Sequence, residues 1–115
     1  MDVNDFFSSL NPNFTGLVVK FKSCSQFKYS NHVFLQMAER AISADAVEAV
    51  ATRGKVIRVY ADERPFPCFL LLGRENLLAL HVIAQNQSDA TCIVVTAYWP
   101  DPEQWSADFK TRLKR

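Results

Sequence analysis

The sequence predicts an α+β domain in which two N-terminal helices pack on a four-stranded antiparallel sheet, with one more helix at the C-terminal end. Three observations predict this class: two capped stretches with helical spacing of their apolar residues, four short β-branched runs with brief connections, and a third capped stretch near the end. Strands joined by such short loops pair antiparallel, and helices that cover one face of such a sheet make an α+β domain.

The length and composition of the chain favour a single domain. Its 115 residues are 49% hydrophobic and 22% charged, which is ordinary for one globular domain with one core. We expect this domain to cover residues 1–115, divided into an N-terminal arm (1–28), a core (29–106) and a C-terminal helix (101–115).

The first predicted helix follows the arm. Within the arm, residues 1–16 have the composition of a short helix and a turn, and residues 17–22 alternate as a short edge strand does. Ser30 can cap a helix over residues 31–41. The apolar residues of that helix recur with core-facing spacing: Val33, Phe34, Met37, Ala38 and Ala41.

A second helix is predicted directly after the first. Ser43 provides its cap, and Asp45 favours its positive N-terminal end. Gly54 stands where a helix most often ends in the left-handed conformation. The buried stripe of this helix consists of Ala46, Val47, Val50 and Ala51.

Four strands are predicted after the helices, over residues 55–60, 67–72, 77–85 and 91–99. They are rich in β-branched and apolar residues, and turn-forming residues separate them. A final helix is expected from Asp101, which caps it, because Pro102 and Gln104 follow at favourable positions. The apolar seam of this last helix consists of Trp105, Phe109 and Leu113.

The three cysteines, Cys24, Cys68 and Cys92, lie far apart and form no CxxC pair. Two of them fall within apolar strand-like runs, where a free cysteine acts as a small hydrophobic residue. We therefore expect free thiols in a reducing compartment and no metal site. The acidic N-terminus differs from a secretory signal, and the apolar run at 77–84 is too short to cross a bilayer. These observations predict a cytoplasmic protein without a membrane partner.

Several classes of enzyme are not supported by the sequence. The three glycines are isolated, so no glycine-rich phosphate loop is present, and no HExxH or GxSxG motif occurs. Cysteine catalysis needs electropositive surroundings, which the apolar flanks of Cys68 and Cys92 do not provide. We expect no cofactor.

The net charge of +1 does not by itself indicate a nucleic-acid partner, but its distribution is uneven. Residues 1–60 contain seven Lys/Arg and five Asp/Glu, residues 61–109 contain two and seven, and residues 110–115 contain four and none. The basic tail can attract RNA through its charge. The sequence favours the other interpretation, in which these cations complement the negative end of the last helix.

A polar stripe lies beside the apolar face of the first helix. His32, Gln36 and Arg40 are four residues apart and therefore line one face. An imidazole can transfer a proton near neutral pH and a guanidinium can stabilise charge on phosphate, so this pair suits phosphodiester chemistry. The alternative, favoured by spacing alone, is an exposed helix face on which Arg40 pairs with Glu39, Glu48 or a helix end.

Further polar candidates lie in and beside the predicted strands. His81 shares a strand face with apolar neighbours, and a lone histidine of this kind is more often structural than catalytic. Thr96 and Tyr98 share one face of the last strand. Tyr60 ends the first predicted strand and Arg64 follows it, a combination that can stack a base and hold a phosphate but also occurs in ordinary loops.

The polar candidates belong to a series of short segments whose order and spacing form a recognisable pattern. It is carried by His32-x7-Arg40-Ala-Ile-Ser43, Ala46-Val-Glu-Ala-Val50, Gly54-Lys-Val-Ile57, Tyr60-x3-Arg64-Pro-Phe-Pro67, Leu70-Leu-Leu-Gly73, Leu80-His-Val82, Val95-Thr-Ala-Tyr98 and Pro100-Asp-Pro-x2-Trp105. In order and spacing these segments resemble the bacterial family known as domain of unknown function 4258. The resemblance covers roughly residues 30–106, and about the first 25 residues lie outside it.

This family is grouped with the fold shared by barnase, EndoU, colicin-type nucleases and RelE. The resemblance therefore implies helices followed by a four-stranded antiparallel sheet, and a metal-independent RNase that uses the ribose 2′-hydroxyl as nucleophile. The residues that it marks are His32, Arg40, His81 and Tyr98 for catalysis, and Tyr60, Arg64 and Thr96 for substrate binding.

Two functions follow as hypotheses. In the first, a toxin-type endoribonuclease acting on RNA, His81 or His32 is the general acid or base. Arg40 and Arg64 hold the phosphate in this hypothesis. The second is a non-catalytic protein-binding or accessory module of the same fold, for which an antitoxin protein is a candidate partner. Convergence of the two histidines, Arg40 and Tyr98 in one open cleft favours the enzyme, and their separation favours the module.

Overall fold

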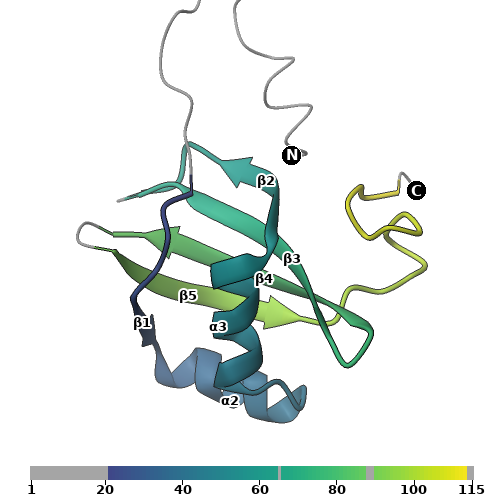
Figure 1. Ribbon diagram of the computed structural model, residues 1–115, viewed down its shortest axis with the longest axis horizontal. Helices are drawn as coiled ribbons and strands as arrows, with labels where there is room; N and C mark the ends of the chain where they lie inside the picture. Colours follow the sequence, from purple (N-terminus) through teal and green to yellow (C-terminus); the bar gives the residue numbers. More distant parts are fainter. Residues whose placement is uncertain (1–20, 65, 88–89, 114–115) are drawn as a thin grey trace, which may run out of the picture.

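The structure is a computed structural model that describes residues 21–64, 66–87 and 90–113. The described elements are β1 (Gln26–Tyr29), α2 (Asn31–Glu39), α3 (Ala44–Arg53), β2 (Lys55–Tyr60), β3 (Cys68–Glu75), β4 (Leu78–Asn86) and β5 (Thr91–Tyr98). The strands form one sheet in the order β1-β5-β4-β3-β2. Both helices lie on the same face of this sheet, α3 against β3 and β4 and α2 against β5 (Figure 1).

The predicted four-stranded antiparallel sheet is wrong, because the sheet has a fifth strand and is mixed. β1 pairs in parallel with β5, from Gln26 opposite Thr91 to Tyr29 opposite Val94, whereas the other pairs are antiparallel. A parallel pair needs a long crossover, and both helices and three strands lie between β1 and β5. A strand of four residues is too short for the alternating pattern to reveal it from the sequence.

The predicted helix at 1–16 and most of the predicted edge strand at 17–22 lie outside the described residues. The two described residues of that stretch, Phe21 and Lys22, are not in a strand. Phe21 packs edge-on against Phe69 with 5.1 Å between ring centroids, so the chain before β1 already contacts the core.

Serine caps begin both helices, as the sequence predicts. Ser30 Oγ accepts from the backbone N–H of Val33 at 3.1 Å, and Ser43 Oγ accepts from that of Ala46 at 3.0 Å. These bonds satisfy N–H groups that have no partner inside a helix. Neither of the described helices is long and apolar enough to cross a membrane.

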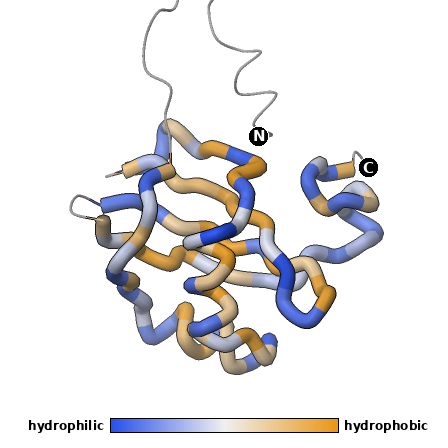
Figure 2. The backbone as a smooth tube through the Cα atoms, viewed as in Figure 1, coloured by the Kyte–Doolittle hydropathy of each residue, from blue (hydrophilic) through white to orange (hydrophobic). Residues whose placement is uncertain are grey.

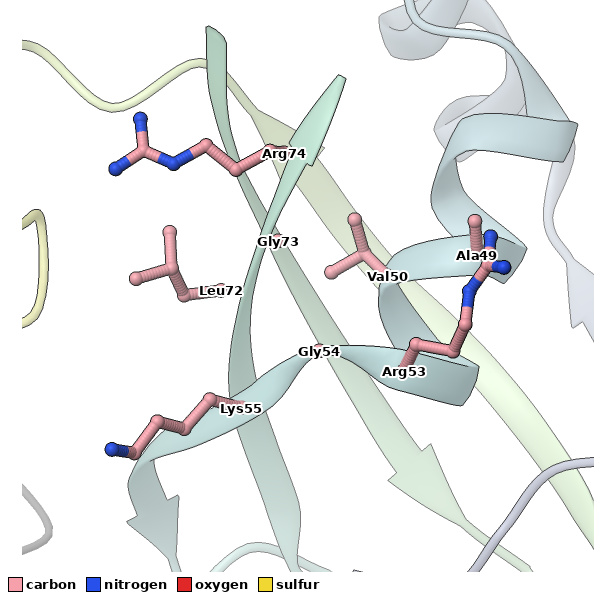
Figure 3. A pocket seen from close by; sticks show the side chains of 8 residues that line it. All are labelled: Ala49, Val50, Arg53, Gly54, Lys55, Leu72, Gly73 and Arg74. Atoms are coloured by element: carbon pink, nitrogen blue, oxygen red, sulfur yellow. The ribbon is translucent and has the colours of Figure 1, made fainter. Parts of the chain in front are cut away.

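Two glycines allow α3 to lie close to β3. The expected left-handed helix end at Gly54 is wrong, since its φ is −72°. A Cβ at Gly54 would instead collide with the carbonyl oxygen of Val50, and one at Gly73 would lie 2.5 Å from the Val50 Cγ2 atom. Figure 3 shows Val50 directed toward the part of β3 that contains Gly73. Both positions therefore need glycine for its small size.

The sheet face beneath the helices holds the larger hydrophobic core. Hydrophobic stretches follow the central strands in Figure 2, and alternate strand positions point into this core. Its most deeply buried members, each at most 1% exposed, include Val47, Phe69, Leu71, Leu80, Val82 and Val94. The Tyr29 hydroxyl donates to Glu48 Oε2 at 2.6 Å and thereby ties the edge strand β1 to α3.

No helix forms among the described residues after β5, so the predicted C-terminal helix is wrong. Asp101 begins a single turn, but local side-chain bonds then compete with a helix for the backbone. Ser106 Oγ accepts from the backbone N–H of Thr111 at 3.1 Å, and Asp108 Oδ1 accepts from the N–H two residues later at 3.1 Å. Such bonds favour turns. Residues 101–113, here called the C-terminal segment, are therefore irregular, and Figure 1 draws them in yellow.

Cys24 and Cys92 form a disulfide, contrary to the expected free thiols. The bond joins the chain before β1 to the start of β5, across 68 residues of sequence. Both cysteines are buried beside Ala51 of α3. Sequence spacing does not reveal this pair, because only the parallel pairing of β1 with β5 brings the two cysteines together. Cys68 is free and buried.

Candidate functional site

The face of the sheet that points away from the helices carries several of the polar candidates, and we call it the outer sheet face. Side chains alternate along each strand, so the pairing places Lys55, Leu72, His81 and Tyr98 in one row across β2, β3, β4 and β5. The polar side chains that define the outer sheet face are Lys55, Arg58, Tyr60, Arg74, His81 and Tyr98.

His81 lies at the centre of this face and is 0% exposed. Its Nε2 lies 2.9 Å from the carbonyl oxygen of Phe109, and its Nδ1 lies 3.2 Å from the Tyr98 hydroxyl oxygen. A carbonyl oxygen can only accept, so Nε2 carries the proton of the neutral ring and Nδ1 accepts from Tyr98. The hydrogen bonds therefore run in one direction, from Tyr98 through His81 to Phe109.

The surroundings hold both side chains in their neutral forms. Burial lowers the pKa of His81 to about 4, the positive charge of Arg58 adds to this, and the bond to the Phe109 carbonyl opposes it. Burial raises the pKa of Tyr98 to about 12, the nearby Tyr60 adds to this, and two neighbouring arginines oppose it. At neutral pH the imidazole is therefore uncharged and the phenol keeps its proton.

The C-terminal segment covers this pair. Trp105 is 4% exposed, and its ring lies 4.5 Å from the His81 ring at an interplanar angle of 85°. The Arg58 guanidinium lies 5.4 Å from the Trp105 ring centroid, and the Arg74 guanidinium lies 5.8 Å from that of Phe109. Cation–π contacts of this kind attach the segment to the sheet. The cover is thus a short irregular segment held by two aromatic rings.

The strands of the outer sheet face contribute cations and no acid. Lys55, Arg58 and Arg74 point to this side, whereas Glu75 follows Arg74 and points to the other. The remaining described acids of residues 61–109 lie in the turn after β2 and in the C-terminal segment. The excess of acidic residues in the stretch 61–109 therefore does not lie on the strand residues that form this face.

A pocket of about 260 Å³ lies beside the outer sheet face, where α3 passes into β2. Three of its lining residues are cations: Arg53, Lys55 and Arg74. Figure 3 shows that they diverge, since Lys55 and Arg74 extend to one side of β3 with Leu72, and Arg53 extends to the other side beside Ala49. The pocket does not gather three charges around one ligand, but two of its cations belong to the outer sheet face.

The polar stripe of α2 forms a separate group at the edge of β5. Arg40 Nη1 donates to Thr96 Oγ1 at 3.3 Å and to the Ala97 carbonyl oxygen at 2.7 Å. Thr96 Oγ1 donates to Gln36 Oε1 at 3.1 Å, and Gln36 Nε2 lies 3.0 Å from Nε2 of His32. Only His32, at the end of this series of bonds, is exposed. The other members fasten α2 to β5.

The residues predicted for the site fall in three places: His81, Tyr98 and Tyr60 on the outer sheet face, His32, Arg40 and Thr96 at the β5 edge, and Arg64 in the turn after β2. Arg64 is exposed and donates to the backbone carbonyls of Asp62 and Glu63 at 3.2 and 3.3 Å. The first two groups approach each other only along β5, where Thr96 and Tyr98 are two residues apart, so His32 and Arg40 do not converge with His81 and Tyr98 in one cleft. This is the outcome expected of the non-catalytic module.

Sequence reasoning missed Arg58, Trp105 and Phe109 as members of the group around His81. The position of Arg58 could have been predicted, because alternation along β2 places its side chain on the sheet face opposite to that of its buried neighbour Val59. The positions of the two aromatic residues could not, since they depend on the absence of the predicted helix. The described residues contain no cluster of His, Cys, Asp and Glu that could hold a metal ion. Burial raises the pKa of the Cys68 thiol, which disfavours it as a nucleophile.

Comparison with known protein families adds one finding to this geometry. The model of the family described as "Domain of unknown function (DUF4258)" matches residues 29–99, which is more than half of the chain. The match runs from the end of β1 to the residue after β5, so it includes both helices, four strands and the His81–Tyr98 pair. No curated protein and no solved structure matches the chain significantly.

Proposed function

The chain belongs to the DUF4258 family, and from this premise we propose that it is a metal-independent endoribonuclease of toxin type that acts at the outer sheet face. The observation that carries the proposal is the hydrogen-bonded His81–Tyr98 pair at the centre of a face to which the strands contribute Lys55, Arg58 and Arg74. The grouping of the family with the fold of barnase, EndoU, colicin-type nucleases and RelE is part of the same proposal.

Charge and aromatic side chains support RNA as the substrate. Lys55, Arg58 and Arg74 would contact phosphate groups, and the half-buried rings of Tyr60 and Tyr98 would stack on bases or bond to them. Each phosphate contact displaces counterions from the RNA. The affinity should therefore fall steeply as the salt concentration rises.

The reaction forms a bond between the ribose 2′-oxygen and phosphorus and breaks the bond from phosphorus to the 5′-oxygen. The 2′-hydroxyl loses its proton to water, and the departing 5′-oxygen needs one. Displacement of the C-terminal segment would bring water to His81 and return its pKa toward the ordinary value of 6.5. Protonated Nδ1 then donates to the Tyr98 oxygen, so the phenol O–H can turn outward and protonate the 5′-oxygen.

In this proposal the covered protein is inactive, because a neutral His81 accepts from Tyr98 and keeps its hydroxyl turned inward. RNA binding at the arginines that hold Trp105 and Phe109 would displace the cover by competition for the same cations. A toxin also requires inhibition in the cell that makes it. An acidic antitoxin protein seated on the outer sheet face would supply it.

The test is cleavage of single-stranded RNA by purified protein in the presence of EDTA, with detection of products that end in a 2′,3′-cyclic phosphate. We expect Tyr98→Phe and His81→Gln to abolish cleavage. His32→Ala is the matched control and should cleave like the wild type, since His32 belongs to the separate group of side chains between α2 and the edge of β5. Equal cleavage by wild type and Tyr98→Phe contradicts the proposal.

A second function is favoured by two observations: the predicted site residues do not converge in one cleft, and His81 is 0% exposed with both of its ring nitrogens already bonded. The second describes the expected state of a structural histidine in a non-catalytic binding module. The two functions differ in a binding assay. The module should bind RNA or an acidic protein through Arg58 and Arg74, without cleavage at any pH, and should keep its affinity in Tyr98→Phe.

The cellular location is linked to the state of two cysteines. A cytoplasmic location, as the sequence led us to expect, predicts free thiols at Cys24 and Cys92, because the cytoplasm keeps thiols reduced. The disulfide between them supports an oxidising compartment. Alkylation of the protein in intact cells, before and after reduction, separates the two locations by the number of thiols that react.

A further inference from the structure

Among the described residues, no strand pairs with the last residues of β5 on the side opposite β4. β1 pairs with β5 only as far as Val94, so the stretch from Val95 to Tyr98 is an edge. A register shift against β4 falls at Val95, and such a bulge bends the strand. Backbone groups on an edge need other partners, and the carbonyl oxygen of Ala97 accepts from Arg40 at 2.7 Å.

Arg40 also binds the chain on the other side of Tyr98. The indole Nε1–H of Trp99 donates to the Arg40 carbonyl oxygen at 2.7 Å. Arg40 is the C-cap of α2, so this oxygen has no acceptor role inside the helix and is available to the indole. Tyr98 therefore stands between two residues, Ala97 and Trp99, that are both bound to Arg40.

The guanidinium is itself held in place. Its Nη1 lies 3.3 Å from Thr96 Oγ1, and the Thr96 hydroxyl donates to Gln36 one turn earlier on α2. A planar guanidinium loses little freedom when several acceptors fix it. The edge of β5 beside Tyr98 is thus fixed by α2 through side-chain and backbone bonds on both sides of that residue.

We propose that Arg40 is a positioning residue for the His81–Tyr98 pair, acting through the backbone of β5 without contacting the substrate. The Tyr98 hydroxyl meets His81 Nδ1 at 3.2 Å, so a small displacement of this strand would break that bond. An effect of Arg40 on catalysis rests on the proposed function, whereas its effect on the His81–Tyr98 hydrogen bond does not. This role differs from phosphate binding, the role for which the sequence made Arg40 a candidate.

The variants that test this proposal are Arg40→Ala, Arg40→Lys and Trp99→Phe. Arg53→Ala is the matched control, because it removes the same charge from the last turn of the other helix and has no bond to β5. The structural readout is the ¹⁵N NMR spectrum of the His81 ring, in which Nδ1 loses its acceptor signature when the bond to Tyr98 breaks. The second readout is kcat and KM for RNA cleavage.

We expect Arg40→Ala and Trp99→Phe to change the His81 spectrum and to lower kcat by about 10- to 100-fold with KM unchanged. Arg40→Lys should restore part of kcat, because a lysine can still donate to the Ala97 carbonyl. Arg53→Ala should change neither readout. Should Arg40→Ala fail to fold, Trp99→Phe still removes one of the two bonds while keeping an aromatic ring.

Two results overturn the proposal. An unchanged His81 spectrum in both Arg40→Ala and Trp99→Phe shows that the pair does not depend on Arg40. A raised KM with unchanged kcat, together with a weaker salt dependence of binding, shows that Arg40 contacts phosphate directly. If the wild type does not cleave RNA, the proposed function fails, and the NMR comparison still decides the positioning role.

Discussion

The two faces of the sheet are covered in different ways. Two capped helices cover one face and pack aliphatic and aromatic side chains against it. The outer face buries His81 through hydrogen bonds and aromatic contacts, beneath a segment without regular structure. Segments held by few contacts open at lower free energy than packed helices do. We therefore expect packing on the helix face to contribute more to global stability than packing on the outer sheet face.

Among the tests of this comparison, we expect the largest effect on stability from two neighbouring leucines of β3. Leu71 points to the helix face and Leu70 to the outer face, and each is 1% exposed. We expect Leu71→Ala to lower the free energy of unfolding by about 4 kcal/mol, and Leu70→Ala by about 2 kcal/mol, because the irregular cover can settle into the cavity. Urea denaturation measures both values. A larger loss for Leu70→Ala contradicts the comparison.

The buried imidazole should make stability depend on pH. The pKa of His81 is lowered to about 4 from 6.5, so between these values the unfolded chain binds a proton that the native protein does not. Stability therefore falls as the pH falls from 6.5 to 4, by about 3 kcal/mol at the lower end. Denaturation across this range should be flatter in His81→Gln. The control His32→Gln should keep the wild-type dependence, and an equal effect of both substitutions rules out His81 as the cause.

Removal of the cover should affect the outer face alone. Trp105→Ala should lower the free energy of unfolding by about 2 kcal/mol, the transfer value for one large buried side chain, since the segment can rearrange. Water should then reach His81, and its pKa should rise toward 6.5. NMR titration of the two histidines measures this directly. A pKa that remains near 4 means that the sheet, and not the segment, buries the imidazole.

We expect the smallest effects on stability from substitution of two serines, one for each face of the sheet. Ser43→Ala removes the cap of α3 and should cost about 1 kcal/mol of global stability. Ser106→Ala removes bonds within the C-terminal segment and should change global stability by less than about 0.5 kcal/mol. It should nevertheless speed amide hydrogen exchange across residues 101–113. Unchanged exchange in Ser106→Ala indicates a segment that does not open by itself.

The sequence predicted both helices and four of the strands close to their observed positions, because caps and apolar periodicity are local signals. The prediction failed for features that depend on contacts between residues far apart in the sequence. β1 exists because it pairs with β5, and the Cys24–Cys92 disulfide depends on the same pairing. The C-terminal helix was predicted from Asp101, Pro102 and Gln104, yet the side chains that follow bind the backbone and turn the chain toward His81.

The candidate site was predictable only in part. The sequence identified His81 and Tyr98 separately, but only the register of β4 and β5 pairs them. It placed His32 and Arg40 on one face of a helix, but α2 ends at Glu39, one residue before Arg40, and the packing of α2 against β5 directs the Arg40 guanidinium to Thr96 and to the Ala97 carbonyl oxygen. Helical spacing specifies which residues share a face, and it does not specify what that face contacts.

We propose that the outer sheet face holds a reactive His81–Tyr98 pair beneath a removable C-terminal segment. The most direct test compares RNA cleavage at pH 6 in EDTA by wild type, Trp105→Ala and the double variant Trp105→Ala/Tyr98→Phe. We predict cleavage about tenfold faster in Trp105→Ala than in wild type, and none in the double variant. Equal rates in the single and double variants, or no cleavage in any of the three, contradict a reactive His81–Tyr98 pair.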